Sequence, residues 1–161
     1  MSKELIKQLI KETVLSEQIK KKNVSYTALV LTRQGHNELI SKMANEFPID
    51  EWEKVAHHVT LNMGSWKGDP NLIGKEYTIE AVSFAKDGLV IACGVKMNDT
   101  GLPSKANPHI TIAVNRAAGG KPAMSNNLDW TMETLLDSPI ILTATLLEVE
   151  QGMNEVFADE Y

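Results

Sequence analysis

Two stretches of this 161-residue chain, HHVTLNMG (residues 57–64) and PHITIAVN (residues 108–115), decide the predicted fold. Both contain a histidine, an apolar residue, a threonine and a second apolar residue, in that order. Alternation of polar and apolar residues is typical of a half-buried β-strand. The chain has four histidines, and two of them begin this tetrapeptide on a predicted strand. The repetition indicates that both strands contribute to one site.

Strand geometry predicts where the side chains of these stretches lie. Side chains two residues apart share a face of a strand. We therefore expect His58 and Thr60 on one face of the first strand, and His109 and Thr111 on the corresponding face of the second. The apolar residues between them face the core. By the same parity His57 falls on the core face and points away from His58, so we expect it to be structural.

The remaining elements are predicted from hydrophobic periodicity and from Gly, Pro, Asn and Asp turn signals. We expect helices over residues 2–21, 35–46 and, shorter, 128–136. We expect strands over residues 24–32, 56–63, 109–115 and 139–151, and a hairpin over 76–97 that turns at Asp87-Gly88. The acidic tail is an end strand or a loosely held segment. Six strands with hairpins among them favour an α+β domain built on antiparallel sheet.

Composition narrows the classes of partner. The net charge is −5, and a protein that grips long nucleic acid usually presents a basic surface, so extended RNA or DNA is not the expected partner. No apolar run is long enough to cross a bilayer, and the charged start MSKELIKQLI is not a secretory signal. The single cysteine, Cys93, cannot form an internal disulfide. We expect a cytoplasmic protein in which Cys93 is a small core residue.

Paired histidines and threonines on two neighbouring strands favour acid/base chemistry at a phosphodiester. A neutral imidazole takes a proton near pH 7, and an imidazolium gives one. Two such groups on opposite sides of a phosphorus activate the attacking oxygen and protonate the leaving oxygen. Threonine hydroxyls donate hydrogen bonds to the non-bridging oxygens. This chemistry needs no metal and no other cofactor, so the sequence predicts a metal-free phosphodiesterase.

Three other interpretations of the histidines stay open. A zinc site needs three or four ligands and would have to recruit His36 and His57 to join His58 and His109. Structural histidines with satisfied hydrogen bonds would do no chemistry, and we expect this for His36 and His57. A non-catalytic module with the same groove would bind a nucleotide or an RNA end without cutting it.

The tetrapeptides HVTL (58–61) and HITI (109–112) resemble the paired H-x-T-x motifs of the two-histidine phosphoesterase superfamily. Its members include LigT-like RNA cyclic phosphodiesterases, the cyclic phosphodiesterase domains of fungal tRNA ligases, the myelin cyclic nucleotide phosphodiesterase and phage anti-CBASS enzymes. The order of the predicted elements is also similar over residues 24–150. GGKPAMSNNL (119–128) resembles the Lys-Pro loop that follows the second motif in tRNA-ligase-type and myelin-type members.

The resemblance implies a bilobed fold of antiparallel sheets related by a pseudo-two-fold, with helices on the outer faces and both motifs in a central groove. It implies metal-independent cleavage of a phosphodiester next to a ribose 2′-hydroxyl. His58 and His109 would be the acid/base pair, in an order that the sequence does not fix, and Thr60 and Thr111 would bind the phosphate. The acidic balance favours a small nucleotide substrate, either a 2′,3′-cyclic phosphate or a cyclic oligonucleotide signal.

Other residues are candidates for substrate binding. Tyr26 on the first strand and Trp66 in the loop after the first motif are placed to stack on a base. Lys121 follows two glycines, and a flexible loop with a lysine suits a phosphate. Asn126 and Asn127 suit either a base edge or a turn.

The resemblance also divides the chain. Residues 1–22 form an N-terminal helix extension with no counterpart in the family, and residues 23–161 form the phosphoesterase domain. A phage enzyme that destroys cyclic oligonucleotide signals would suit such a chain, and its expected location is then the host cytosol.

Overall fold

The computed structural model of the protein describes residue 3 and residues 23–161, so the predicted helix over 2–21 lies outside the described residues apart from residue 3. The described strands are β1 (Val24–Leu31), β2 (Glu53–Lys54), β3 (His58–Met63), β4 (Glu76–Lys86), β5 (Val90–Lys96), β6 (His109–Val114) and β7 (Thr134–Glu150). Within residues 23–161 the α-helix is α2 (Arg33–Met43). Short 3-10 turns are η1 (Pro70–Leu72), η2 (Arg116–Ala118), η3 (Pro122–Asn127), η4 (Trp130–Met132) and η5 (Ala158–Glu160).

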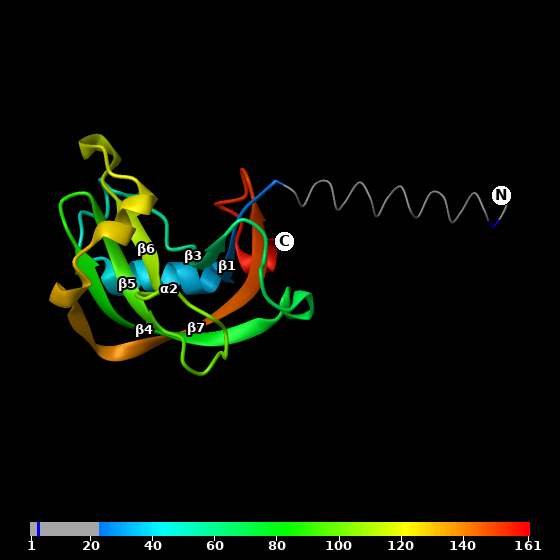
Figure 1. The fold of residues 1–161 in the computed structure, drawn as a ribbon. Coiled ribbons are helices and arrows are strands. Elements are labelled where there is room, and N and C mark those ends of the chain that lie inside the picture. Colours follow the sequence, from blue (N-terminus) through cyan, green and yellow to red (C-terminus); the bar gives the residue numbers. More distant parts are fainter. Residues whose placement is uncertain (1–2, 4–22) are drawn as a thin grey trace.

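The described strands form one antiparallel sheet in the order β2-β6-β3-β1-β7-β4-β5. Because β5 pairs in addition with β6, six strands close into a ring, and β2 extends the pairing along β6. Figure 1 shows α2 among these strands, and it contacts β1, β6 and β7. The mixed α+β class with antiparallel pairing is therefore confirmed.

The helix α2 begins and packs as its residues require. The Oγ1 of Thr32 accepts a hydrogen bond of 3.1 Å from the backbone N–H of Gly35, so Thr32 is the N-cap. Leu39 and Met43 recur at helical spacing and are fully buried in the main core. They pack with apolar side chains of the ring such as Leu31, and this contact fixes α2 against the sheet.

The prediction of two sheets in two lobes differs from this arrangement. The outer strand of the 76–97 hairpin, β5, pairs with β6, from Val90 with Val114 to Gly94 with His109. This pairing joins the hairpin directly to the strand of the second motif, so the described strands form a single sheet. The two-residue strand β2 was also not predicted, because Glu53 and Lys54 carry no strand pattern.

The predicted helix over 128–136 is wrong. Only the single turn η4 forms there, with Asp129 as its cap, and β7 starts at Thr134 instead of 139. Thr134 pairs with Phe84 and Ile140 pairs with Ala81, and the register shifts between them. Pro139, which cannot donate to a ladder, falls in this irregular part of the strand, where it is tolerated.

The remaining strand and turn predictions agree with the structure within a few residues. Cys93 is fully buried in β5, as expected, and burial raises the pKa of its thiol to about 12. The acidic tail is neither an end strand nor loose, because Phe157 is buried in the main core. None of the helices in the described part of the chain has the length and apolar content needed to span a membrane.

Candidate active site

The two H-x-T motifs lie on adjacent strands and line one pocket. β3 and β6 pair antiparallel, with Val59 opposite Ile110, and both of these residues are fully buried. The histidine and threonine of each motif lie on the other face of the strand. His58, Thr60, His109 and Thr111 all line the same pocket of about 240 Å³. Strand parity therefore placed these four side chains correctly.

The first motif makes contacts within the pocket wall. His58 Nε2 lies 3.0 Å from the Oγ1 of Thr60, its neighbour two residues along the strand. The ring of Tyr26 stacks on the His58 ring with centroids 4.5 Å apart. Tyr26 donates its hydroxyl proton to the Oδ1 of Asn154 at 3.1 Å. The aromatic stack and the threonine contact fix the plane of the His58 ring.

His57 does not point away from His58, so the prediction from parity is wrong. The Nδ1 atoms of the two rings lie 2.9 Å apart. The strand begins only at His58, because Ala56 has a left-handed φ of 39° that breaks the extended backbone just before the pair. His57 is nevertheless buried, as expected for a structural residue, and its Nε2 lies 2.7 Å from the carbonyl oxygen of Val156.

The second motif is held by a buried serine. His109 donates Nδ1–H to the carbonyl oxygen of Asn107 at 2.7 Å, and its Nε2 lies 3.0 Å from the Oγ of Ser125. The Ser125 hydroxyl also lies 2.8 Å from the Oγ1 of Thr111 and donates to the carbonyl oxygen of Pro122 at 2.7 Å. Ser125 is 2% exposed and connects both functional side chains of this motif.

Sequence reasoning missed three polar residues of the pocket: Lys105, Ser125 and Asn154. Ser125 falls inside the 119–128 loop, where the sequence predicts Lys121 and the asparagines, but not the serine, as binding residues. Lys105 lies in the loop before the second motif and adds a positive charge. Asn154 comes from the tail, and no local pattern connects it with the motifs.

The predicted accessory residues have mixed outcomes. Tyr26 and Asn126 line the pocket. Trp66 does not, because its Nε1 donates to the carbonyl oxygen of Asp69 within its own loop and its ring packs on the core. Lys121 is exposed beside the lining residue Pro122 but does not line the pocket itself.

Burial and local positive charge lower the pKa of the pocket histidines. Burial, together with smaller effects of charge on His57, His109 and Lys105, lowers the pKa of His58 to about 3. Burial also lowers the pKa of His109, while its bond to the Asn107 carbonyl acts in the opposite direction. In the empty pocket both imidazoles are therefore neutral at pH 7. A bound phosphodiester adds a negative charge that favours protonation of one ring.

These shifts predict that the protein loses stability in mild acid. Above pH 6.5 the histidines are neutral in both the folded and the unfolded state. Below that value the unfolded chain binds protons that the folded His58 does not, so the free energy of unfolding falls as the pH falls. Replacing His58 by Gln should flatten the curve of stability against pH between 4.5 and 6.5, by up to about 1.4 kcal/mol per pH unit. Denaturant titrations of both proteins measure this slope, and parallel curves would contradict the prediction.

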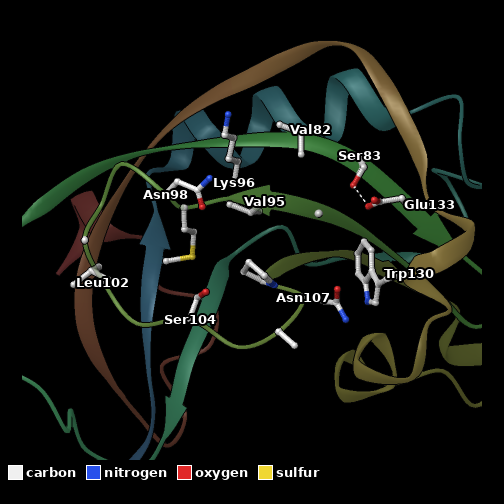
Figure 2. Close-up of a pocket in the computed structure, with 15 residues that line it drawn as sticks. Val82, Ser83, Val95, Lys96, Asn98, Leu102, Ser104, Asn107, Trp130 and Glu133 are labelled. Atoms are coloured by element: carbon white, nitrogen blue, oxygen red, sulfur yellow. Dashed lines mark hydrogen bonds between the residues drawn. The ribbon is translucent and has the colours of Figure 1, made fainter.

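A second hollow lies on the other side of His109. It has a volume of about 450 Å³, and Ser83, Asn107, Trp130 and Glu133 contribute to its wall (Figure 2). Ser83 donates to the Oε2 of Glu133 at 2.6 Å, and the Trp130 ring lies 5.4 Å from the ring of His109. The hollow exposes the Trp130 indole and the Asn107 amide next to the second motif, and it too was not predicted.

Gly94 makes this close packing possible. A Cβ on Gly94 would lie 2.3 Å from the Oγ of Ser83 and 3.3 Å from the Trp130 ring. The absence of a side chain on this residue lets the indole and the Ser83–Glu133 pair approach β5.

The histidines outside the motifs do not build a metal centre. His36 Nδ1 lies 3.1 Å from the carbonyl oxygens of Val55 and Ala56, and its ring packs on Phe157. Across residues 23–161, no three His, Cys, Asp or Glu side chains are placed to hold an ion together. The polar groups that line the pocket are therefore two imidazoles, several hydroxyls, two amides and one ammonium group.

Neither a protein-family model nor a curated protein matches this sequence. The proposed membership of the two-histidine superfamily therefore rests on the two motifs and on the pocket that they line.

Proposed function

We propose that the protein is a metal-independent phosphodiesterase of the two-histidine type, which acts on a small nucleotide with a phosphodiester next to a ribose 2′-hydroxyl. The observation that carries the proposal is that His58, Thr60, His109 and Thr111 line one pocket from adjacent strands. Two imidazoles and two hydroxyls are the groups needed to move two protons and to hold a phosphate between them.

The register of β3 and β6 supports this proposal. Val59 lies opposite Ile110, and each is the residue after the histidine of its own motif. A local two-fold axis through this pair would relate His58 to His109 and Thr60 to Thr111. The proposed pseudo-two-fold of the family would require this relation. A phosphate near the axis would meet one imidazole on each side, as in-line displacement demands.

Charge and size favour a small anionic substrate. Lys105 and the threonine hydroxyls provide one cationic and several neutral donors. The pocket of about 240 Å³ suits a ribose phosphate better than a longer chain, and the neighbouring hollow beside His109 has room for a base. We propose 2′,3′-cyclic phosphates and cyclic oligonucleotides as the substrate classes.

The experiment that tests the proposal is incubation of the protein with a panel of 2′,3′-cyclic mononucleotides and cyclic di- and trinucleotides, with and without EDTA. Mass spectrometry of the products should show the addition of one water to the phosphodiester, unaffected by EDTA. The variant with both His58 and His109 replaced by Ala is the control. A ligand that binds but stays intact would favour a binding module, and inactivity on every substrate without binding would contradict both functions.

Trp130 is expected to bind the base of the substrate. Its ring lies beside His109 at the wall of the larger hollow, and stacking of a base on an aromatic side chain contributes about 1–3 kcal/mol. Trp130→Ala should raise KM about tenfold and leave kcat within about threefold, because the indole does not touch the phosphate. Trp66→Ala is the matched control, since Trp66 lies away from both hollows. Equal KM values for wild type and Trp130→Ala would exclude this role.

A further inference from the structure

The rings of Tyr26, His58 and His57 and the carbonyl group of Val156 form a hydrogen-bonded series behind the first motif. The carbonyl oxygen of Val156 lies 2.7 Å from His57 Nε2, and the two Nδ1 atoms of His57 and His58 are 2.9 Å apart. His57 is 1% exposed, so water does not replace either partner. The carbonyl oxygen at the end of this hydrogen-bonded series can only accept, so it determines the direction of each hydrogen bond in the series.

The proton on His57 is fixed by Val156. Its Nε2 must carry hydrogen to donate to the carbonyl oxygen, and burial lowers the pKa of His57, which favours the neutral ring. A neutral imidazole has one N–H, so the Nδ1 of His57 is a bare acceptor. Among the described residues, the only group within hydrogen-bond distance of it is the Nδ1 of His58. That nitrogen therefore donates.

The contacts of Tyr26 agree with this direction. The Tyr26 hydroxyl gives its proton to the Oδ1 of Asn154 at 3.1 Å, which leaves its lone pairs to face His58 Nδ1 at 3.4 Å. Both neighbours of His58 Nδ1 are thus acceptors. With Nδ1 protonated and the ring neutral, His58 Nε2 is bare, and it accepts the hydroxyl proton of Thr60 at 3.0 Å.

We propose that His57 is a positioning residue that holds His58 as the Nδ1–H tautomer and so makes His58, and not His109, the general base of the proposed phosphodiesterase. The inference rests on that proposed function. The two histidines therefore have different roles. His58 presents an unprotonated Nε2 to the pocket, and His57 keeps that nitrogen unprotonated.

The second motif has the opposite hydrogen-bond pattern. Ser125 gives its proton to the Pro122 carbonyl, so its oxygen is free to accept from His109 Nε2 at 3.0 Å. The Nδ1 of His109 donates to the Asn107 carbonyl. Both nitrogens of His109 thus face acceptors, and both are satisfied only when the ring carries two protons. Bound phosphate charge favours that state, and His109 is then the general acid.

The resulting step conserves atoms and charge. His58 Nε2 takes a proton from the attacking water, and the water oxygen forms a bond to phosphorus. The bond from phosphorus to the ribose oxygen breaks, and that oxygen takes the Nε2 proton of His109. The net change is addition of one water across the phosphodiester. Exchange with solvent then returns a proton from His58 to His109.

The test is ¹⁵N NMR of the histidine rings at pH 7, combined with two variants of His57. In the wild type, His58 should show a protonated Nδ1 and a bare Nε2. His57→Asn places an amide oxygen near the position of Nδ1 and keeps an acceptor for His58, so it should retain this tautomer. His57→Leu fills the space without an acceptor, so it should mix the tautomers and lower kcat about 10²-fold, with the acidic limb of the pH profile, which the base sets, displaced.

The wild-type spectrum keeps the test valid even if a variant does not fold. A protonated Nε2 on His58 in the wild type would overturn the inference. So would His57→Leu with unchanged tautomer, kcat and pH profile. A wild-type protein with the expected tautomer but no phosphodiesterase activity would instead contradict the proposed function, and with it the role of base. The two failures are therefore distinguishable.

Discussion

Replacing either His58 or His109 by Ala is expected to lower kcat/KM by about 10²–10⁴, the usual effect of removing one acid/base group. Each imidazole lines the pocket and reaches a threonine or serine hydroxyl of its own wall, and no other described histidine lines it. The loss should be mainly in kcat, because proton transfer occurs in the transition state and not in substrate binding. Steady-state hydrolysis of the best substrate of the panel measures it.

The matched control for this prediction is His36→Asn. His36 lies outside the pocket, and an Asn amide keeps a donor for the carbonyl oxygens that face its Nδ1. This variant should keep activity within about threefold of the wild type. Circular dichroism and thermal unfolding of all three variants separate loss of chemistry from loss of fold. Full activity with both His58 and His109 replaced would refute acid/base catalysis by this pair.

Replacing Thr60 or Thr111 by Val is expected to lower kcat about 10²-fold, the second largest effect. Valine has nearly the shape of threonine but donates no hydrogen bond, and loss of one donor to a developing phosphate charge costs about 10²–10³ in rate. Thr→Ser keeps the hydroxyl and should restore most of the activity. Kinetics of the four variants test this expectation.

An exposed threonine on another strand serves as the comparison for these variants. Thr143 of β7 faces solvent and lies on neither motif strand, so Thr143→Val should leave kcat unchanged. If Thr60→Val and Thr111→Val behave like Thr143→Val, the hydroxyls do not bind the phosphate.

The motif strands could be predicted from the sequence because the pattern that predicts each strand lies within the strand itself. Alternation along residues 58–63 and 109–114 reports the face of each side chain, and the structure places His58, Thr60, His109 and Thr111 in one pocket accordingly. Alternation does not predict the direction of the side chain one residue earlier, at His57. The left-handed backbone at Ala56 interrupts the extended geometry just before His57, so the alternation does not hold there, and alanine gives no signal of this conformation.

The rest of the site depends on contacts between distant segments. Ser125 reaches His109 from a loop 16 residues away, and Asn154 reaches Tyr26 from the tail. Trp130 faces His109 only because β7 starts early and ends the predicted helix after a single turn. The ring likewise closes through the pairing of β5 with β6, and the hydrophobic pattern of neither strand predicts that pairing.

The pairing of β3 with β6 also bears on how the ring opens. Between these strands a single residue pair, Val59 with Ile110, is in register, whereas β1, β4 and β7 are joined along most of their lengths. The two motifs thus flank the junction of the described ring with the fewest residue pairs, which Val55 and Ala56 extend by donating to the carbonyl oxygens of Ile112 and Thr111. Local opening follows the least bonded part of a fold. The proposed site therefore lies beside the junction at which the described ring would open at the lowest cost.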